Sequence, residues 1–298
     1  MMGAHFDRFI GEMMYAAFEI KPELRKSLRR EIAFIELDEL PNLAAVHDLV
    51  IEKEIEDILH RSRDEQIKWF ESRCGMSPFD RDLGGDLADV AGLRNLIAHH
   101  GGRVTNKVGF GIRKRRQGFL SQYKVGESVF VNGQDIDAVH DILVTAALSI
   151  SQNTWRNLRK DQMQSADIVF HELTYTCLAL EEFKLAQRML LLGFKFREAM
   201  SLTCRLVSTV NLAQAFKWLG DRAGCLNVLG SEDWNLHEPP YRLSVAVLTE
   251  NWEEARVLMQ QCAEEDLVDQ AEFEDWPVFR DFRETEHYQE VFAEVYPA

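Results

Sequence analysis

Hydrophobic residues recur at helical spacing along most of the chain. In residues 40–74, apolar positions return every three or four residues, which is the period of one face of an α-helix. We therefore expect one long amphipathic helix there, with Asn42 as its N-terminal cap. The next stretch, 75–86, combines Gly75, Pro78 and two adjacent glycines, and we expect it to break the helix.

Two further long helices are predicted in the first half, at 87–100 and 137–158, with one or two helices within 5–36. Gly101 supplies the left-handed residue that commonly ends a helix. Between these helices the period changes. Apolar and polar residues alternate within 103–136, and Gly126 and Asn132-Gly133 interrupt them as turns, which predicts a small β-hairpin-like insert.

After residue 162 the pattern predicts pairs of short helices with a weak internal repeat. EFKLAQRML (182–190) aligns with NWEEARVLM (251–259), and a small alanine occupies the same position in both. A small residue there lets two helices approach closely, as stacked helix pairs require. A degenerate copy, LGDRAGCLNVL, lies between them at 219–229. An ordinary helical bundle is the alternative interpretation of this half.

These patterns predict an all-α chain with two domains. The first, 1–160, is a helical bundle that carries the hairpin-like insert, and the second, 161–298, is a helical-repeat domain. With 298 residues, of which 46% are hydrophobic, the chain is long and apolar enough to build a sizeable core.

Charge divides unevenly between the two halves. The chain has a net charge of −15, but residues 1–160 hold 23 Lys+Arg against 24 Asp+Glu, a net −1. Residues 161–298 hold 11 against 25, a net −14. The second half is therefore a poor surface for nucleic acid and a plausible one for a basic protein partner.

One window of the first half is strongly basic. Residues 91–126 contain no Asp or Glu and eight Lys or Arg. A local concentration of positive charge can bind a phosphate backbone even in a chain that is acidic overall. We expect the RNA-binding residues to be Arg103, Lys107, Arg113, Lys114, Arg115 and Arg116.

The remaining composition favours an intracellular protein without cofactors. Five dispersed cysteines without a C-x-x-C pair predict reduced thiols in the cytoplasm. No apolar run is long enough to span a bilayer, and the first residues lack the pattern of a secretory signal. No Cys/His spacing typical of a metal site and no phosphate-binding nucleotide loop occurs, so no metal or cofactor is predicted.

The stretch RNLIAHHGG, which begins at Arg94, carries the candidate chemistry. On the predicted helix, Arg94 and His99 flank a strip of small residues formed by Ala88, Ala91, Ala98 and Asn95. Arginine binds phosphate in a planar two-pronged geometry, and histidine titrates near neutral pH and can move a proton. RNA supplies its own nucleophile, the 2′-hydroxyl, and Asn95 can orient either group. The alternative is a helix end with polar capping residues.

RNLIAHHGGRV closely resembles the Arg-Asn-x-x-x-His-x-x-Gly signature of HEPN domains. The surroundings agree, because a long helix, the motif helix, a β-like insert and another long helix follow one another over about 35–160. The resemblance implies a homodimer in which two motif helices face each other, and a metal-independent endoribonuclease with Arg94, Asn95 and His99 in the catalytic site. His100 is the alternative histidine. It falls on the apolar arc of the helix, the expected core face formed by Leu87, Val90, Leu93, Leu96 and Ile97, so His99 is preferred.

The second half is similar to tetratricopeptide-like repeats, with 273–292 as a closing segment. Such repeats bind proteins or peptides, which implies a protein partner or antitoxin at the acidic domain. The family resemblance implies a toxin or an antiviral-defence effector that cleaves RNA. Two alternatives remain: a non-catalytic interaction or adaptor protein, and a helical domain that binds nucleotides through the same arginine and histidine.

Overall fold

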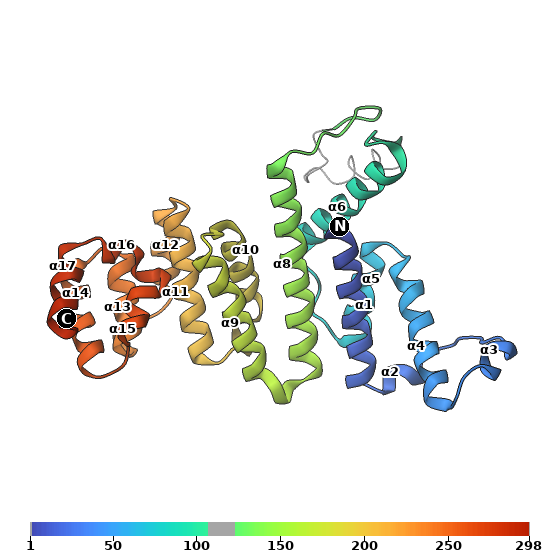
Figure 1. Ribbon diagram of the computed structural model, residues 1–298, viewed down its shortest axis with the longest axis horizontal. Helices are drawn as coiled ribbons and strands as arrows, with labels where there is room; N and C mark the ends of the chain where they lie inside the picture. Colours follow the sequence, from blue (N-terminus) through green and yellow to red (C-terminus); the bar gives the residue numbers. More distant parts are fainter. Residues whose placement is uncertain (1, 107–122, 298) are drawn as a thin grey trace. The chain divides into compact units, whose positions relative to one another are not determined.

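The computed structural model describes residues 2–106 and 123–297 (Figure 1). Within these residues the secondary structure is helical and contains no strand, which confirms the predicted all-α class. The chain forms two compact units, Met1–Gln162 and Met163–Ala298. The predicted domains, 1–160 and 161–298, differ from these units by two residues at the boundary. None of the described helices is long and apolar enough to cross a membrane.

The first unit is a bundle in which α1 packs against α4 and α8, and α6 packs against α5 and α8. Its elements are α1 (Met2–Ile20), α2 (Glu23–Lys26), α3 (Phe34–Asp38), α4 (Leu43–Leu59), α5 (Arg63–Cys74), α6 (Arg81–His100), α8 (Gly133–Leu158) and the 3₁₀ turn η1 (Lys160–Gln162).

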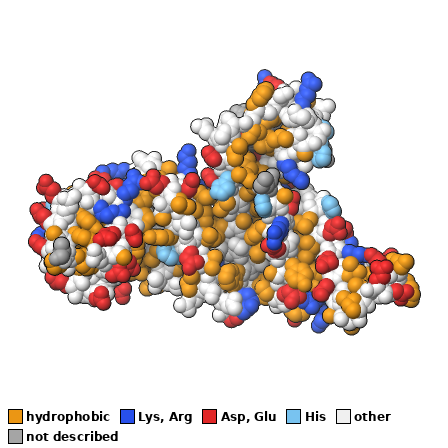
Figure 2. Space-filling view, viewed as in Figure 1, with side chains coloured by type: hydrophobic (Ala, Val, Ile, Leu, Met, Phe, Trp, Pro, Cys, Tyr) orange, Lys and Arg blue, Asp and Glu red, His pale blue; other side chains and the backbone are white. Residues whose placement is uncertain are grey.

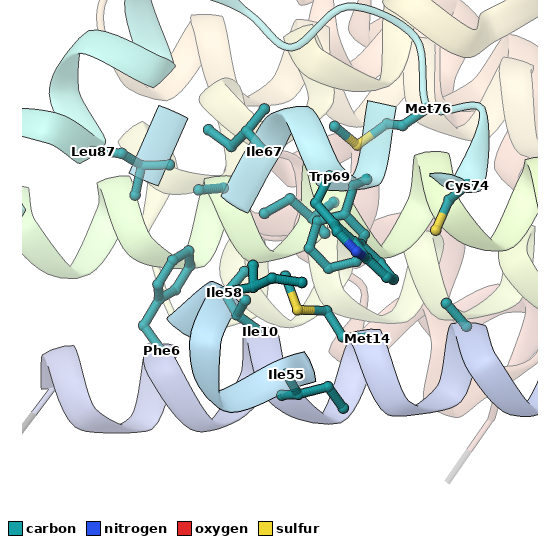
Figure 3. Close-up of a cluster of buried hydrophobic side chains, with 14 of the residues drawn as sticks. Phe6, Ile10, Met14, Ile55, Ile58, Ile67, Trp69, Cys74, Met76 and Leu87 are labelled. Carbon is teal, nitrogen blue, oxygen red and sulfur yellow. The ribbon is translucent and has the colours of Figure 1, made fainter. Parts of the chain in front are cut away.

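The core of this bundle follows from the helical spacing of apolar residues. Phe6, Ile10 and Met14 are four residues apart, so they form one stripe along α1 and are all buried. Figure 3 shows Ile10 and Met14 directed toward Ile58 of α4. Burying side chains of this size contributes roughly 1.5–3 kcal/mol each relative to exposure. The stripe therefore fixes α1 against its neighbours.

The single helix predicted over 40–74 is wrong, because the chain forms α4 and α5 with a turn between them. Asn42 does cap α4, since its Oδ1 accepts a hydrogen bond from Ala45 N at 3.0 Å. Ser62 begins α5 through a reciprocal capping box with Glu65. Apolar residues keep their helical spacing across this turn, so periodicity alone does not indicate that the helix ends there.

The predicted breaker 75–86 is also partly wrong, because α6 begins at Arg81 and its first turns contain the adjacent glycines. Asp80 caps this helix, with Oδ1 accepting from Leu83 N at 2.8 Å. Leu83 and Leu87 are buried, and this packing compensates for the poor helix propensity of glycine. Gly101 ends the helix in the left-handed conformation, φ 56°, as predicted.

The predicted hairpin-like insert is reduced, in the described residues, to an isolated antiparallel bridge between Arg103 and Ser128. Val104 N donates to Glu127 O at 2.8 Å, so the two flanks of the insert pair. Asn132 was expected in a turn of the insert. It caps α8 instead, because its Oδ1 accepts from the backbone at the third residue of that helix. The centre of the insert lies outside the described residues.

The second unit is a succession of helix pairs, in which α9 packs on α10, α11 on α12, and α13 on α14. Its elements are α9 (Met163–Ala179), α10 (Phe183–Gly193), η2 (Phe194–Ala199), α11 (Leu202–Trp218), α12 (Arg222–Leu229), η3 (Trp234–Leu236), α13 (Pro239–Leu248), α14 (Trp252–Glu264), α15 (Gln270–Asp275), η4 (Pro277–Phe279), α16 (Arg280–Arg283) and α17 (Glu286–Val295).

The three pairs share one turn geometry. In each, the residue two positions before the second helix has a positive φ, a conformation that non-glycine residues rarely adopt. These residues are Glu181 (φ 61°), Gly220 (φ 81°) and Glu250 (φ 62°). The fourth residue of each second helix is small and buried, and these residues are Ala186, Cys225 and Ala255. The aligned segments 182–190 and 251–259 thus occupy equivalent places in two pairs.

All five cysteines are free, and four of them are buried. Burial raises the pKa of the Cys74 thiol to about 11 and that of Cys262 to about 12, which keeps both thiols protonated and unreactive near neutral pH.

Candidate functional site

The last half of α6 presents the motif residues to solvent. Leu93 and Leu96 are buried in a small cluster with Val104 and Val129, and this packing fixes the rotation of the helix. The polar side chains of the motif then fall on the open side. Arg94, Asn95, His99 and His100 are all exposed.

These four residues line one wall of a cleft of about 700 Å³. The cleft is lined by α6, the α4–α5 turn and the start of α1. Small residues of α6 form part of its surface, as the sequence predicted for Ala88 and Ala91. The turn between α4 and α5 contributes further basic and imidazole groups, namely His60, Arg61 and Arg63.

Arg94 extends toward the first turn of α1. A Cβ placed on Gly3 would lie 3.6 Å from Arg94 Cδ and 3.9 Å from its Nε. Glycine at this position therefore leaves the arginine room to lie close to the backbone. Within the described parts of the chain, no hydrogen bond or ion pair involves the Arg94 side chain. Its guanidinium is thus available to an anion that enters the cleft.

Arg63 has a different role, because its guanidinium is already engaged. Nη2 pairs with Asp7 Oδ1 of α1, and Nη1 donates to Gln66 Oε1 at 2.6 Å. The same group lies over the ring of Phe6, with Cζ 5.1 Å from the centroid. Arg63 therefore connects α5 to α1. Its neighbour Arg61 is exposed and makes no side-chain ion pair among the described residues, so it is a second available cation.

His99 is preferred in the sequence because His100 falls on the apolar face of the predicted helix. In the structure this apolar face is not buried in the last turn of α6. Ile97, expected on the core face, is 53% exposed. His99 and His100 are both exposed and both line the cleft, so His100 stays an equal alternative. Both lie in the last turn of the helix.

Sequence reasoning missed His60 and Arg61 as cleft residues. In the sequence His60 is an isolated histidine within the helix expected over 40–74, but in the structure it is the C-terminal cap residue of α4 and borders the cleft. Its Nε2 lies 4.0 Å from Glu56 Oε1 on the exposed side of the helix. The Ser-x-x-Glu capping box that begins at Ser62 is a signal that could have located this turn.

Of the predicted RNA-binding residues, Arg103 is described. It is exposed, and its Nε donates to Gly126 O at 2.9 Å, so part of its guanidinium holds the base of the insert. Lys107, Arg113, Lys114, Arg115 and Arg116 lie outside the described residues.

Large apolar side chains are exposed beside the motif. They are Ile97 (53%), Phe130 (81%), Val131 (39%) and Ile136 (47%). Val129, adjacent to this group, packs into the same cluster as Leu96, so the group lies next to the end of α6. In Figure 2, hydrophobic side chains lie beside histidine and basic ones over α6 and the start of α1. Exposed apolar surface of this kind commonly marks an interaction site.

Comparisons with family models, with curated proteins and with solved structures found no match to this chain. The fold and cleft define an all-α protein of two units in which one unit carries an exposed Arg/His cleft. Among the described residues, no group of three or more His, Cys, Asp or Glu is arranged to hold a metal ion.

Proposed function

We propose that the chain is a metal-independent endoribonuclease of the HEPN type. The observation that carries this proposal is that Arg94, without a partner among the described residues, lines the same cleft as His99 and His100. A cation that binds phosphate and an imidazole that moves a proton are the two groups that cleavage of RNA by its own 2′-hydroxyl requires.

The chemistry follows from these groups. Arg94, with Arg61 on the facing wall, holds the non-bridging oxygens of the scissile phosphate and stabilises the charge that develops on them. His99 accepts the proton of the 2′-hydroxyl as its oxygen bonds to phosphorus. The bond from phosphorus to the 5′-oxygen breaks, and a second imidazole returns a proton to that oxygen. The products are a 2′,3′-cyclic phosphate and a 5′-hydroxyl.

We further propose that the active form is a homodimer joined through α6. The exposed side chains of Ile97, Phe130 and Ile136 support this, because pairing two copies through them removes apolar area from water. The strip of small residues on α6 allows close approach of a second helix or of RNA. In this arrangement each copy supplies an Arg94 and a histidine to one composite site, and the second imidazole comes from His100 or from the other copy.

The role proposed for the second unit is to bind a protein partner, such as an antitoxin, through tetratricopeptide-like repeats. Its successive helix pairs and the net charge of −14 over 161–298 support this role. A toxin or antiviral-defence effector in the cytoplasm is the setting that the family resemblance implies, and the free, mostly buried thiols are compatible with a reducing compartment.

The residue assignment is tested by RNA cleavage in EDTA with single variants. Arg94→Ala is expected to abolish cleavage. Loss of cleavage in only one of His99→Ala and His100→Ala identifies that histidine as the working one, with the second imidazole supplied by the other copy, whereas loss in both shows that each copy supplies both imidazoles. Arg81→Ala is the matched control, because Arg81 is exposed on the same helix and does not line the cleft. Full activity of Arg94→Ala would contradict the assignment.

A non-catalytic adaptor is the second candidate, and one observation favours it. The short helix α3 exposes Phe34 (77%) and Ile35 (71%), and Leu43 at the start of α4 is 68% exposed. Apolar exposure on this scale is typical of a protein-binding surface. Salt-dependent RNA binding separates the candidates, because affinity through phosphate contacts falls steeply as salt rises and an adaptor shows no such binding.

A further inference from the structure

The second unit contains a cavity of about 550 Å³ lined by α9, α11, α13 and η4. Its walls are mainly aromatic and aliphatic. The side chains that form them include Tyr175, Val207, Val210, Tyr241, Trp276 and Pro277. A cavity of this size and composition is suited to an apolar group larger than a methyl, and to a few polar contacts that fix its orientation.

Two residues that line the cavity each carry a buried polar atom without a hydrogen-bond partner among the described residues. Asn211 is only 7% exposed, and its Nδ2 makes no hydrogen bond. His171 Nδ1 is also buried without a partner. Burial lowers the pKa of His171, which keeps the imidazole neutral and able to offer either a donor or an acceptor. Leaving such groups unpaired costs about 1–3 kcal/mol each, so a bound group that pairs with them gains that amount.

The cavity lining carries one charged side chain. Among its lining residues Glu238 carries the single charge, and neither Lys nor Arg is present. Near Tyr175, burial and the carboxylates of Asp275 and Glu272 raise the tyrosine pKa, and the cation of Arg283 opposes the carboxylates. Arg283 does not line the cavity, and it donates to two backbone carbonyls, Phe273 O at 3.1 Å and Trp276 O at 3.0 Å. Glu238 therefore favours a cation at the rim of the cavity.

We propose that this cavity binds an extended peptide segment in which a bulky apolar side chain stands next to Lys or Arg. The apolar side chain enters between Tyr175, Tyr241 and Trp276. Asn211 Nδ2 donates to a backbone carbonyl of the peptide, and the peptide cation pairs with Glu238. The inference rests on the partner-binding role proposed for the second unit and specifies its ligand. It does not depend on the nuclease, because every lining residue belongs to the second unit.

The observations favour a peptide over other ligands. A nucleic acid needs cations, and the lining supplies none. A peptide group offers both a carbonyl for Asn211 and an N–H for a neutral His171, so it satisfies both unpartnered atoms together. The side chains of the bound peptide then supply the bulky apolar group for the cavity and the cation for Glu238.

The test is a selection from a random dodecapeptide library on the immobilised full chain. The expected result is a consensus with a bulky apolar residue adjacent to Lys or Arg. A fluorescent peptide of the consensus sequence then measures affinity for variants by anisotropy. Tyr241→Ala is expected to raise the dissociation constant at least about tenfold, and Asn211→Leu by a similar factor, which is the size of one lost hydrogen bond.

Glu238→Gln is expected to weaken binding about threefold and to reduce its salt dependence, whereas Glu290→Gln makes the same charge change on an exposed residue that does not line the cavity and should have no effect. Tyr241 is only partly buried, so its variant keeps the test valid if Asn211→Leu misfolds. Failure to enrich any consensus, an acidic consensus, or equal affinity for Tyr241→Ala and the wild type would overturn the proposal. RNA cleavage by the same variants is expected to be unchanged, so the outcome is independent of the nuclease.

Discussion

Arg94 of α6 lies close to Gly3 of α1, with its Cδ 3.6 Å from the position that a Cβ on Gly3 would occupy. Residues ninety-one positions apart in the sequence thus meet at the edge of the cleft. Because the Arg94 side chain makes no hydrogen bond or ion pair among the described residues, a larger side chain at position 3 would limit where its guanidinium can lie.

The first prediction concerns this contact. Gly3→Ala introduces an ordinary van der Waals contact and should leave RNA cleavage unchanged. Gly3→Leu occupies the space of the Arg94 side chain, and we expect RNA cleavage to fall about tenfold, an effect of about 1.4 kcal/mol on the barrier. The melting temperature should stay the same, because Gly3 is outside the core. Wild-type activity of Gly3→Leu would show that the position of Arg94 is unimportant.

A second prediction separates the two arginines of the α4–α5 turn. Arg63→Ala leaves Asp7 without its partner and removes the contact with Phe6, so it should destabilise the fold by about 1–3 kcal/mol in denaturant unfolding. Arg61→Ala removes an exposed cation and should change stability by less than about 0.5 kcal/mol. It should instead weaken RNA binding and reduce its salt dependence. The reverse pattern would refute the roles assigned to the two residues.

Some features of the cleft could be predicted from the sequence, and others could not. The motif on α6, the cap at Asn42 and the end at Gly101 were predictable, because each depends on residues close together in the chain. The break at Ser62 was not taken into account, since the apolar stripe of α4 continues into α5 with the same period. The capping box of Ser62 and Glu65 could nevertheless be recognised in the sequence. The approach of α1 to Arg94 was not predictable, because a pattern along one helix does not identify its neighbour.

Ile97 illustrates a different limit. Periodicity assigned it to the core with Leu93 and Leu96, yet it is 53% exposed while those two are buried. At the last turn of α6, the described residues of the unit cover only about half of the Ile97 side chain. Periodicity reports which positions are apolar, and it does not report whether the chain itself or a second copy covers them.

A third prediction follows from this exposure. The wild type is expected to be a dimer by light scattering after size exclusion. Ile97→Glu is expected to be monomeric and to lose RNA cleavage, because each copy would place one charge in the apolar contact between the two copies. Leu226→Glu is the matched control, since Leu226 is 47% exposed on α12 and belongs to the other unit. A monomeric wild type that cleaves RNA would contradict the composite site.

A fourth prediction tests the packing of the second unit. A Cβ at Gly193 would lie 2.4 Å from Phe170 Cζ, and the Phe170 ring is fully buried against Phe196. Gly193→Ala should therefore destabilise the chain by about 1–3 kcal/mol through overpacking. Gly133→Ala is the control, because nothing lies within 4 Å of its Cβ position at the start of α8. Equal thermal stability of the two variants would be incompatible with the packing of α9 on α10.

The central claim is tested most directly by the ends of the RNA fragments that the wild-type chain produces in EDTA. Incubation of end-labelled RNA with the dimer is expected to give fragments with a 2′,3′-cyclic phosphate and a 5′-hydroxyl, because the 2′-hydroxyl is the nucleophile and the proposed mechanism uses arginine and histidine side chains without a metal ion. Fragments with a 5′-phosphate, cleavage that disappears when metal is removed, or no cleavage by the folded dimer would contradict the account.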